Sequence, residues 1–421
     1  MRRFFLLVLF SLTAACSGAS KPLDAPPMAD GLAAPEPLAW WSRAAIDAYI
    51  RFSSWRGERS GYIVLLARDG VPVYANAAGW KNIEARTPMT LDTEVRIASM
   101  TKPVTAVAAM LLVEQGLLGL DDPVAEYLPA FARLRVATSQ TAGADGSFAS
   151  RPAATPMTVR HLLMFASGIG PGMGESTDLT SLWEARGIHG QADGDLRQRV
   201  DRLAALPLFE EPGTRWRYGA SADVLAAVVQ QVSGRNIGDF MQERIFEPLG
   251  MAHTRFEPPV AERGNMATVY RQDSNGDLVE ADIHYAPDWQ PGGGGLVSTV
   301  SDYMRFALML YNGGEYRGVR ILQQATVDEM RRVHVPEGVL AEQGIAGVGW
   351  GLGMAVVSNA EASRTPDRNG DFWWSGFYGT QFFVSPETGL VGVIMTQNKP
   401  GEFSGINYQP YIVQGLALAG L

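Results

Sequence analysis

The sequence has little cysteine and little histidine. It contains one cysteine, Cys16, so no disulfide can form within the chain. The five histidines are far apart in the sequence, at His161, His189, His253, His284 and His334. None of them belongs to an HExxH or HxH pattern, so the spacing offers no zinc site of the usual kind. Because the only thiol lies in the N-terminal segment, a thiol enzyme is also excluded.

The chain also has no excess of positive charge. The chain of 421 residues has 35 Lys and Arg against 44 Asp and Glu, which gives a net charge of −9. Nucleic-acid binding needs a basic patch, so a nucleic-acid partner is not expected. Hydrophobic residues make up 46% and charged residues 19%, as in an ordinary soluble globular protein. The length alone predicts two or three domains.

Long apolar runs are missing except at the N-terminus. Residues 1–16 read MRRFFLLVLFSLTAAC, in which two arginines precede an apolar run. The run is too short for a membrane-spanning helix, which needs about 20 residues, and it is typical of an export signal. Residues 13–16 resemble a bacterial lipobox, which predicts a periplasmic protein held at the outer membrane by a lipid on Cys16. Secretion without lipidation remains the alternative. Residues 17–38 hold five prolines among small residues and predict an extended linker.

Hydrophobic patterns place strands near both ends of the chain and helices between them. Asp69-Gly70 separates two apolar runs and predicts a hairpin, and Pro386 to Gly389 does the same for a second pair. Helical periodicity covers residues 40–52, 104–118, 221–232, 301–312 and 324–333 and a short stretch at the C-terminus, whereas 137–157 reads as a loop. We therefore expect an α+β sandwich, an antiparallel sheet flanked by helices. The sheet domain would comprise residues 39–125 and 291–421, with a mostly helical insert at 126–290.

A nucleophile is found by elimination. No serine lies in G-x-S-x-G, and no glycine-rich loop matches a phosphate-binding pattern, which leaves Ser99-Met-Thr-Lys102. With 4 lysines and 24 serines in the chain, a Ser-x-x-Lys pair is weak evidence by itself. Its setting strengthens it, because residues three apart share a helix face and a strongly apolar helix follows. Burial favours a neutral lysine, which can act as a base, and the helix N-terminus favours a developing alkoxide.

Four segments in order resemble the serine β-lactamase-like hydrolases over roughly residues 45–415. They are RIASMTKPVTA at 96–106, GLLGLDDPVAEYLP at 116–129, RHLLMFASG at 160–168 and the glycine-rich stretch 292–301. The resemblance implies a β-lactamase/transpeptidase-like fold in which Ser99 attacks a carbonyl and Lys102 takes its proton. The glycines at 292–295 and Asp223 are expected to shape and support the site, and His284 to be structural.

Two further motifs depart from the β-lactamase pattern. The usual Tyr-x-Asn is Tyr218-Gly-Ala220, so the amide that binds substrate in class C enzymes is lost. The usual Lys-Thr-Gly is Trp374-Ser375-Gly376, so a cation that holds a substrate carboxylate is lost. Both changes are similar to the esterases called family VIII.

The resemblance also implies roles for these residues. Tyr218 would share the proton with Lys102, and Trp374, Ser375 and Gly376 would bind substrate. The N–H groups of Ser99 and Phe377 would stabilise the oxyanion. Trp373 adjoins Trp374, and because a strand alternates faces only one of the two tryptophans would line the site.

The expected function is therefore a carboxylesterase that cleaves uncharged esters with short to medium acyl groups. Its partner is a small-molecule ester, and it needs no metal or organic cofactor. One alternative is a β-lactamase or D-Ala-D-Ala carboxypeptidase that uses the same nucleophile. Another is a non-catalytic, envelope-binding lipoprotein. The oligomeric state is left open by the sequence.

Overall fold

The computed structural model describes residues 38–172, 175–186, 194–281, 283, 289–336, 346–363, 367–400 and 408–421. Cys16, the predicted export segment, almost all of the predicted linker and His284 lie outside these ranges. No helix within them combines the length and the apolar character that crossing a membrane would require.

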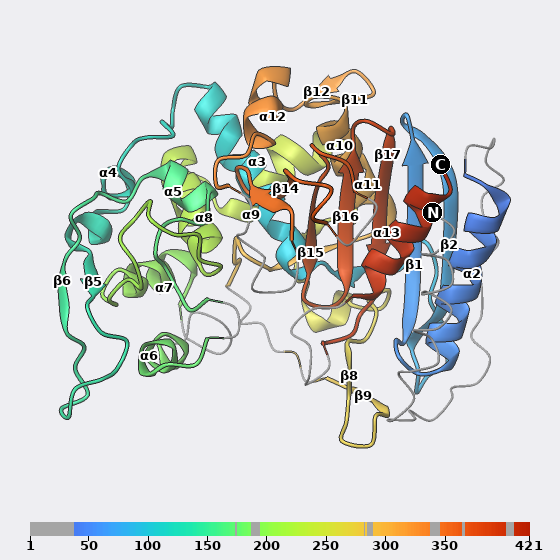
Figure 1. Ribbon diagram of the computed structural model, residues 1–421, viewed down its shortest axis with the longest axis horizontal. Coiled ribbons are helices and arrows are strands. Elements are labelled where there is room, and N and C mark those ends of the chain that lie inside the picture. Colours follow the sequence, from blue (N-terminus) through green and yellow to red (C-terminus); the bar gives the residue numbers. More distant parts are fainter. Residues whose placement is uncertain are drawn as a thin grey trace.

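An eight-stranded antiparallel sheet forms the centre of the structure, in the order β13-β14-β15-β16-β17-β1-β2-β3. Its strands come from both ends of the chain: β1 (Gly61–Arg68), β2 (Val71–Asn82), β3 (Thr87–Pro88), β13 (Val348–Trp350), β14 (Ala355–Val357), β15 (Phe372–Gly376), β16 (Thr380–Ser385) and β17 (Leu390–Met395). The two sets join where β1 pairs with β17, with Ile63 opposite Met395. The predicted antiparallel sheet is confirmed (Figure 1).

Both predicted hairpins are present. Asp69 and Gly70 connect β1 to β2 with φ of 50° and 80°, the backbone of a type I′ turn, whose twist matches that of the flanking strands. The second hairpin joins β16 to β17, and Ser385 lies opposite Leu390 at its closed end.

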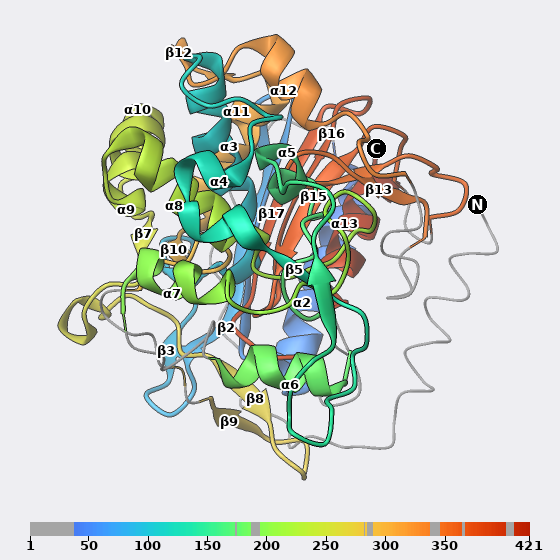
Figure 2. The ribbon, with the colours of Figure 1, turned by 90° about the vertical axis from the view of Figure 1, so that its left-hand side faces the viewer.

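Helices cover the two faces of the sheet. On one face lie α2 (Trp40–Trp55) and α13 (Gln409–Ala419), which contact each other and the sheet. On the other lie α3 (Thr101–Glu114) and α11 (Val300–Tyr311), and α11 packs directly on β1, β16 and β17. Figures 1 and 2 show α2 and α13 on the far side of the sheet from α3. The sheet thus separates an outer helical layer from the layer that carries the predicted nucleophile.

The middle of the chain supplies a helical region beside α3. It contains α4 (Val124–Tyr127), α5 (Val159–Leu163), α6 (Asp178–Ala185), α7 (Leu196–Leu203), α8 (Ser221–Ser233), α9 (Ile237–Met241) and α10 (Glu247–Leu249), and α12 (Gln324–Met330) follows later. The contact of α8 with α3 joins this region to the nucleophile helix. It is the green part of Figure 1.

Short strands occur where the sequence predicted none. The predicted loop 137–157 holds part of a hairpin, β5 (Arg135–Ala137) with β6 (Ser150–Pro152). Others are β7 (Arg255–Phe256), β8 (Tyr270–Gln272) and β9 (Leu278–Glu280), and β10 (Leu296–Ser298) joins β7 to β4 (Val95–Arg96). These strands are two or three residues long, so they give no alternating pattern that a sequence could show.

Candidate active site

Ser99 lies in a tight turn between β4 and α3. The 3-10 turn Ala98–Met100 leads directly into α3, and Ser99 is half-buried between two buried neighbours. Ala98 has a φ of +45°, which is rare for a residue with a side chain and is often found at functional sites. The turn therefore has the strained backbone expected where a fold presents a reactive side chain.

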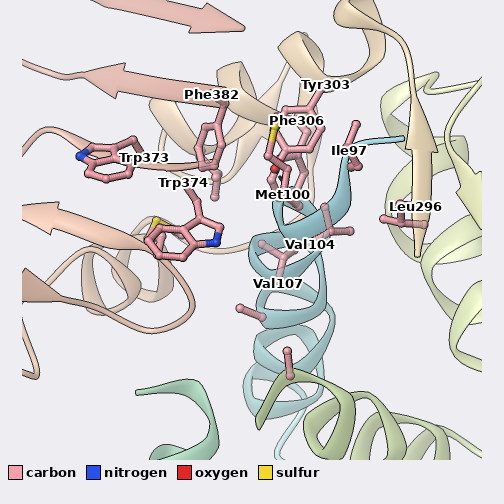
Figure 3. Close-up of a cluster of buried hydrophobic side chains, with 14 of the residues drawn as sticks. Ile97, Met100, Val104, Val107, Leu296, Tyr303, Phe306, Trp373, Trp374 and Phe382 are labelled. Atoms are coloured by element: carbon pink, nitrogen blue, oxygen red, sulfur yellow. Dashed lines mark hydrogen bonds between the residues drawn. The ribbon is translucent and has the colours of Figure 1, made fainter. Parts of the chain in front are cut away.

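Contacts from distant parts of the chain hold this turn in place. The Tyr303 hydroxyl donates to the Met100 carbonyl at 2.8 Å. The Gln397 side chain accepts from the Arg96 N–H at 3.1 Å and donates to the Arg96 carbonyl at 2.9 Å. Figure 3 shows Met100 and Tyr303 among the apolar side chains packed under the turn, with Phe382 beside them. Ser99 is thus fixed by the sheet and α11 as well as by its own helix.

Lys102 meets Ser99 as the spacing predicted. Its Nζ donates to Ser99 Oγ at 3.0 Å and to the Gly293 carbonyl at 2.6 Å. The side chain is buried, with the residue 6% exposed, and Nζ lies 4.7 Å from the centre of the Tyr218 ring. The amine is therefore aimed at the serine hydroxyl by a carbonyl and an aromatic face, a geometry suited to taking its proton.

The glycine-rich loop that holds Lys102 is itself held by Asp223. The Gly293 N–H donates to Asp223 Oδ1 at 3.0 Å, and Asp223 is buried in the first turn of α8. A Cβ on Gly292 would lie 2.3 Å from the Ala222 carbonyl, so only glycine lets the loop come this close to α8. The sequence predicted a supporting role for Asp223 and for the glycines. It did not predict that Asp223, Gly293 and Lys102 form one chain of contacts.

Tyr218 lies beside Lys102 in an aromatic cluster. Its ring stacks on Phe165 at 5.6 Å and 15° and meets Trp374 at 5.5 Å. The segment is anchored by Arg217, whose N–H donates to the Phe165 carbonyl at 2.7 Å. Among the described residues the Tyr218 hydroxyl makes no hydrogen bond to Ser99, so the role of Tyr218 as a base stays a prediction.

The alternation of β15 decides which tryptophan faces this cluster. Trp374 contacts the Tyr218 ring, whereas Trp373 packs edge-on against Tyr411 of α13 at 5.4 Å. Ser375 follows Trp373 to that side, where its Oγ lies 3.2 Å from the Tyr411 hydroxyl. The structure therefore brings Trp374 to the site and does not bring the Ser375 side chain there, because successive residues of a strand point to opposite faces. Only the main chain of Ser375 remains available for substrate binding.

The end of β15 lies directly against the nucleophile turn. A Cβ on Gly376 would be 2.3 Å from the Ile97 carbonyl and 2.2 Å from Thr380 Oγ1, so a larger residue would push the strand away. Phe377 follows at once, with 52% of the residue exposed. The position is consistent with an oxyanion-binding N–H at Phe377, which remains a prediction. Trp374 is 5% exposed; its ring offers an apolar face, and its indole N–H has no acceptor among the described residues.

A cavity of about 420 Å³ lies beside the turn, and its lining includes none of Ser99, Lys102, Tyr218 and Trp374. Its lining comprises Arg96, Arg263, Met266, Ala267, Thr268, Val269, Glu280, Ala281 and Ile283. Val269 and Ala281 pack in one apolar cluster with Ala98, which places the cavity next to the nucleophile turn. The two lining arginines, Arg96 and Arg263, both contact the Glu257 carboxylate. Within the described ranges no three His, Cys, Asp or Glu residues come together in a group that could hold a metal ion.

Comparison with known proteins identifies the family. The model of the family described as Beta-lactamase matches residues 43–416. The chain belongs to the beta-lactamase family. Esterase EstB of Burkholderia gladioli is 33% identical over 370 residues, which cover 82% of this chain and 88% of EstB. Protein Rv1367c of Mycobacterium tuberculosis is 32% identical over 367 residues, covering 84% and 90% of the two chains.

Among solved structures, one similar protein is EstCE1, described as a hydrolase with promiscuous acyltransferase activity. It superimposes with a TM-score of 0.76 at 29% identity, over 90% of this chain and 99% of EstCE1. The predicted resemblance to family VIII esterases and the β-lactamase/transpeptidase-like fold are confirmed. This member of the beta-lactamase family is an esterase-like serine hydrolase.

Proposed function

We propose that this family member is a carboxylesterase that cleaves uncharged esters with short to medium acyl groups through an acyl-enzyme on Ser99. The observation that carries the proposal is the 3.0 Å contact between Lys102 Nζ and Ser99 Oγ, with the amine aimed by the Gly293 carbonyl. The relatives EstB and EstCE1, an esterase and a hydrolase by name, support the same reaction class.

In the acylation step, Ser99 Oγ forms a bond to the ester carbonyl carbon while its proton passes to Lys102 Nζ. The carbonyl oxygen becomes an oxyanion, which the N–H groups of Ser99 and Phe377 stabilise. Collapse of this intermediate breaks the bond to the alcohol oxygen, and the alcohol leaves with the proton that Lys102 held. We propose that the Tyr218 hydroxyl assists this transfer; its ring lies 4.7 Å from Nζ, measured to the ring centre.

Deacylation repeats these steps with water. A water molecule attacks the acyl carbon as Tyr218 or Lys102 takes its proton, the bond to Ser99 Oγ breaks, and the serine regains a proton. The products are a carboxylic acid and free enzyme, so the cycle needs no cofactor.

One residue beside the nucleophile supports the proposed substrate class. At the place of the lysine that holds a carboxylate in penicillin-recognising enzymes stands Trp374, a buried apolar ring. This feature favours uncharged esters over β-lactams and D-Ala-D-Ala peptides.

The test compares three substrate types on the same preparation: p-nitrophenyl esters of increasing acyl length, nitrocefin and a D-Ala-D-Ala peptide. We expect ester hydrolysis to dominate and to disappear in Ser99→Ala. The variant Trp374→Phe serves as a matched control, because it keeps an apolar wall and should keep the ester preference. Turnover of nitrocefin or peptide equal to that of the best ester would overturn the argument from Trp374.

We also propose that the protein is exported and anchored by a lipid on Cys16. Support comes from the basic, apolar and small-residue order of residues 1–16. In cell fractionation, Cys16→Ser should move the protein from the membrane to the soluble periplasmic fraction. If the parent and Cys16→Ser are found in the same fraction, the proposal is contradicted.

A further inference from the structure

The two helices of the outer layer carry very little charge. In α2 and α13 together, the charged residues are Arg43, Asp47 and Arg51, and α13 has none. A helix on a protein surface normally turns charged and polar residues outward. Asp47 points inward instead, since its Oδ1 accepts from Tyr74 at 2.5 Å and from Asn76 at 2.8 Å.

The outward face of α2 is mostly apolar. Its exposed residues form one stripe, which we call the outer stripe: Trp40, Ala44, Ala48, Arg51, Phe52 and Trp55. Trp40 is 74% exposed, Phe52 44% and Trp55 41%. Three aromatic side chains in water on one helix, with an arginine as their one charged neighbour in the stripe, are not explained by the packing of the sheet.

The neighbouring helix extends this face. The two helices run antiparallel, because the Ala39 N–H donates to the Gly420 carbonyl at one end and Ser42 Oγ to the Leu416 carbonyl at 2.7 Å close by. Tyr408, 50% exposed, begins α13, and Ile412, 40% exposed, lies in its first turns. Figure 1 shows α2 at the margin of the molecule and α13 in front of the sheet near β17 and β1.

We propose that the outer stripe, together with Tyr408 and Ile412, docks on the surface of a bilayer that contains anionic lipid. Tryptophan, tyrosine and phenylalanine beside arginine are the side chains that favour the headgroup region of a membrane. The outer stripe contains Arg51 and no acid, so its charge also suits an anionic surface.

The chain that enters α2 points to the same partner. The proline-rich segment of residues 17–37 ends one residue before the described part of the chain, at the N-terminal end of the outer stripe. Fully extended, the 21 residues 17–37 could reach at most about 70–75 Å, which limits how far Cys16 can lie from α2. A lipid on Cys16 would therefore hold this face near the membrane, and two weak signals together give stable binding. This part of the argument rests on the proposed export, whereas the composition of the outer stripe does not.

Docking in this orientation uses no residue of the active site. Ser99 lies on the opposite face of the sheet, in the layer of α3, and no residue of the outer stripe belongs to the site. Membrane binding and ester hydrolysis can therefore be tested separately, and failure of one says nothing against the other.

The single cysteine makes a site-specific test possible. In a Cys16→Ser background, Ala48→Cys carries an environment-sensitive dye on the outer stripe. Leu117→Cys carries the same dye at an apolar position that is 55% exposed and follows α3. Both full-length proteins are titrated with vesicles of phosphatidylcholine, with and without roughly one quarter phosphatidylglycerol.

We expect the dye at position 48 to shift to the blue and brighten several-fold with the anionic vesicles, and the dye at 117 to stay unchanged. A triple variant replaces the three aromatic residues (Trp40→Gln, Phe52→Ser, Trp55→Gln). It should bind vesicles at least tenfold more weakly, as measured with the dye at position 48, and its ester turnover should be unchanged. No response at 48 to either vesicle overturns the proposal. A response at 48 that needs no vesicles and grows with protein concentration assigns the face to a second copy of the chain and overturns it as well.

Discussion

The contact between Asp223 and the Gly293 N–H should set the position of Lys102. Removing the acceptor in Asp223→Ala leaves a buried N–H unpaired, and losing such a hydrogen bond to a charged group costs about 1.5–3 kcal/mol of unfolding free energy. Asp223→Asn keeps an acceptor for this N–H. It also removes a buried carboxylate whose second oxygen has no partner among the described residues. Because its amide is neutral and buries an NH2 group in place of that oxygen, the asparagine variant should lie between the alanine variant and the parent in stability.

The effect on catalysis follows from the next contact. The Gly293 carbonyl lies 2.6 Å from Lys102 Nζ, so a loop that shifts takes the amine with it. Because a displacement of about 1 Å can cost roughly 10²-fold in rate, we expect kcat of Asp223→Ala to fall between about tenfold and a hundredfold. Asp223→Asn should keep kcat within about threefold of the parent.

The assay measures urea unfolding and kcat for one p-nitrophenyl ester on each variant. Asp239→Ala is the matched control, because Asp239 is an exposed acid in the first turn of α9 and contacts no part of the site. An alanine variant that loses stability but keeps full kcat refutes the idea that the loop positions Lys102. An asparagine variant as inactive as the alanine variant shows that the negative charge matters and not the acceptor.

Three other variants test single features. Gly376→Ala should lower kcat and destabilise the fold by about 1–3 kcal/mol, since its Cβ would lie 2.2 Å from Thr380 Oγ1. Gly264→Ala, with no atom within 4 Å of its Cβ, is the control in the same unfolding assay. Tyr218→Phe keeps the ring stacking, so the melting temperature should not change. If the Tyr218 hydroxyl moves the proton, kcat should fall by about 10²–10⁴-fold. An unchanged kcat would exclude the hydroxyl from the mechanism. Burial raises the pKa of the Asp371 carboxyl to about 6, so the folded protein holds this proton more tightly than the unfolded chain does. The resulting stabilisation is complete at low pH and is lost as the pH rises through 6. At about 1.4 kcal/mol per pKa unit, Asp371→Asn should be up to about 3 kcal/mol more stable than the parent at pH 8 in urea unfolding, with little difference near pH 4; equal stability at pH 8 contradicts this.

Local chemistry made much of the fold predictable. Asp69 and Gly70 form a turn because both tolerate positive φ, and this pairs Arg68 with Val71 at the closed end of β1 and β2. Ser99 and Lys102 meet because three residues make almost one helical turn. In each case the residues that determine the structure are neighbours in the sequence.

Features that depend on distant residues were not predictable in this way. Asp223 and Gly293 are 70 residues apart, and no pattern in either segment shows that they bond. The orientation of Trp373, Trp374 and Ser375 depends on which face of β15 meets α3 and which meets α13. Alternation alone restricts the choice to two, and only the assembled layers decide between them.

The central claim is that Ser99 carries the acyl group, and covalent labelling tests it most directly. The protein is incubated with a fluorophosphonate, and the modified peptide is identified by mass spectrometry while ester turnover is followed. The account predicts one phosphonyl group, on the peptide that contains Ser99, with loss of activity in proportion to labelling and no labelling in Ser99→Ala. Modification of a different serine, or ester turnover that persists in Ser99→Ala, would contradict it.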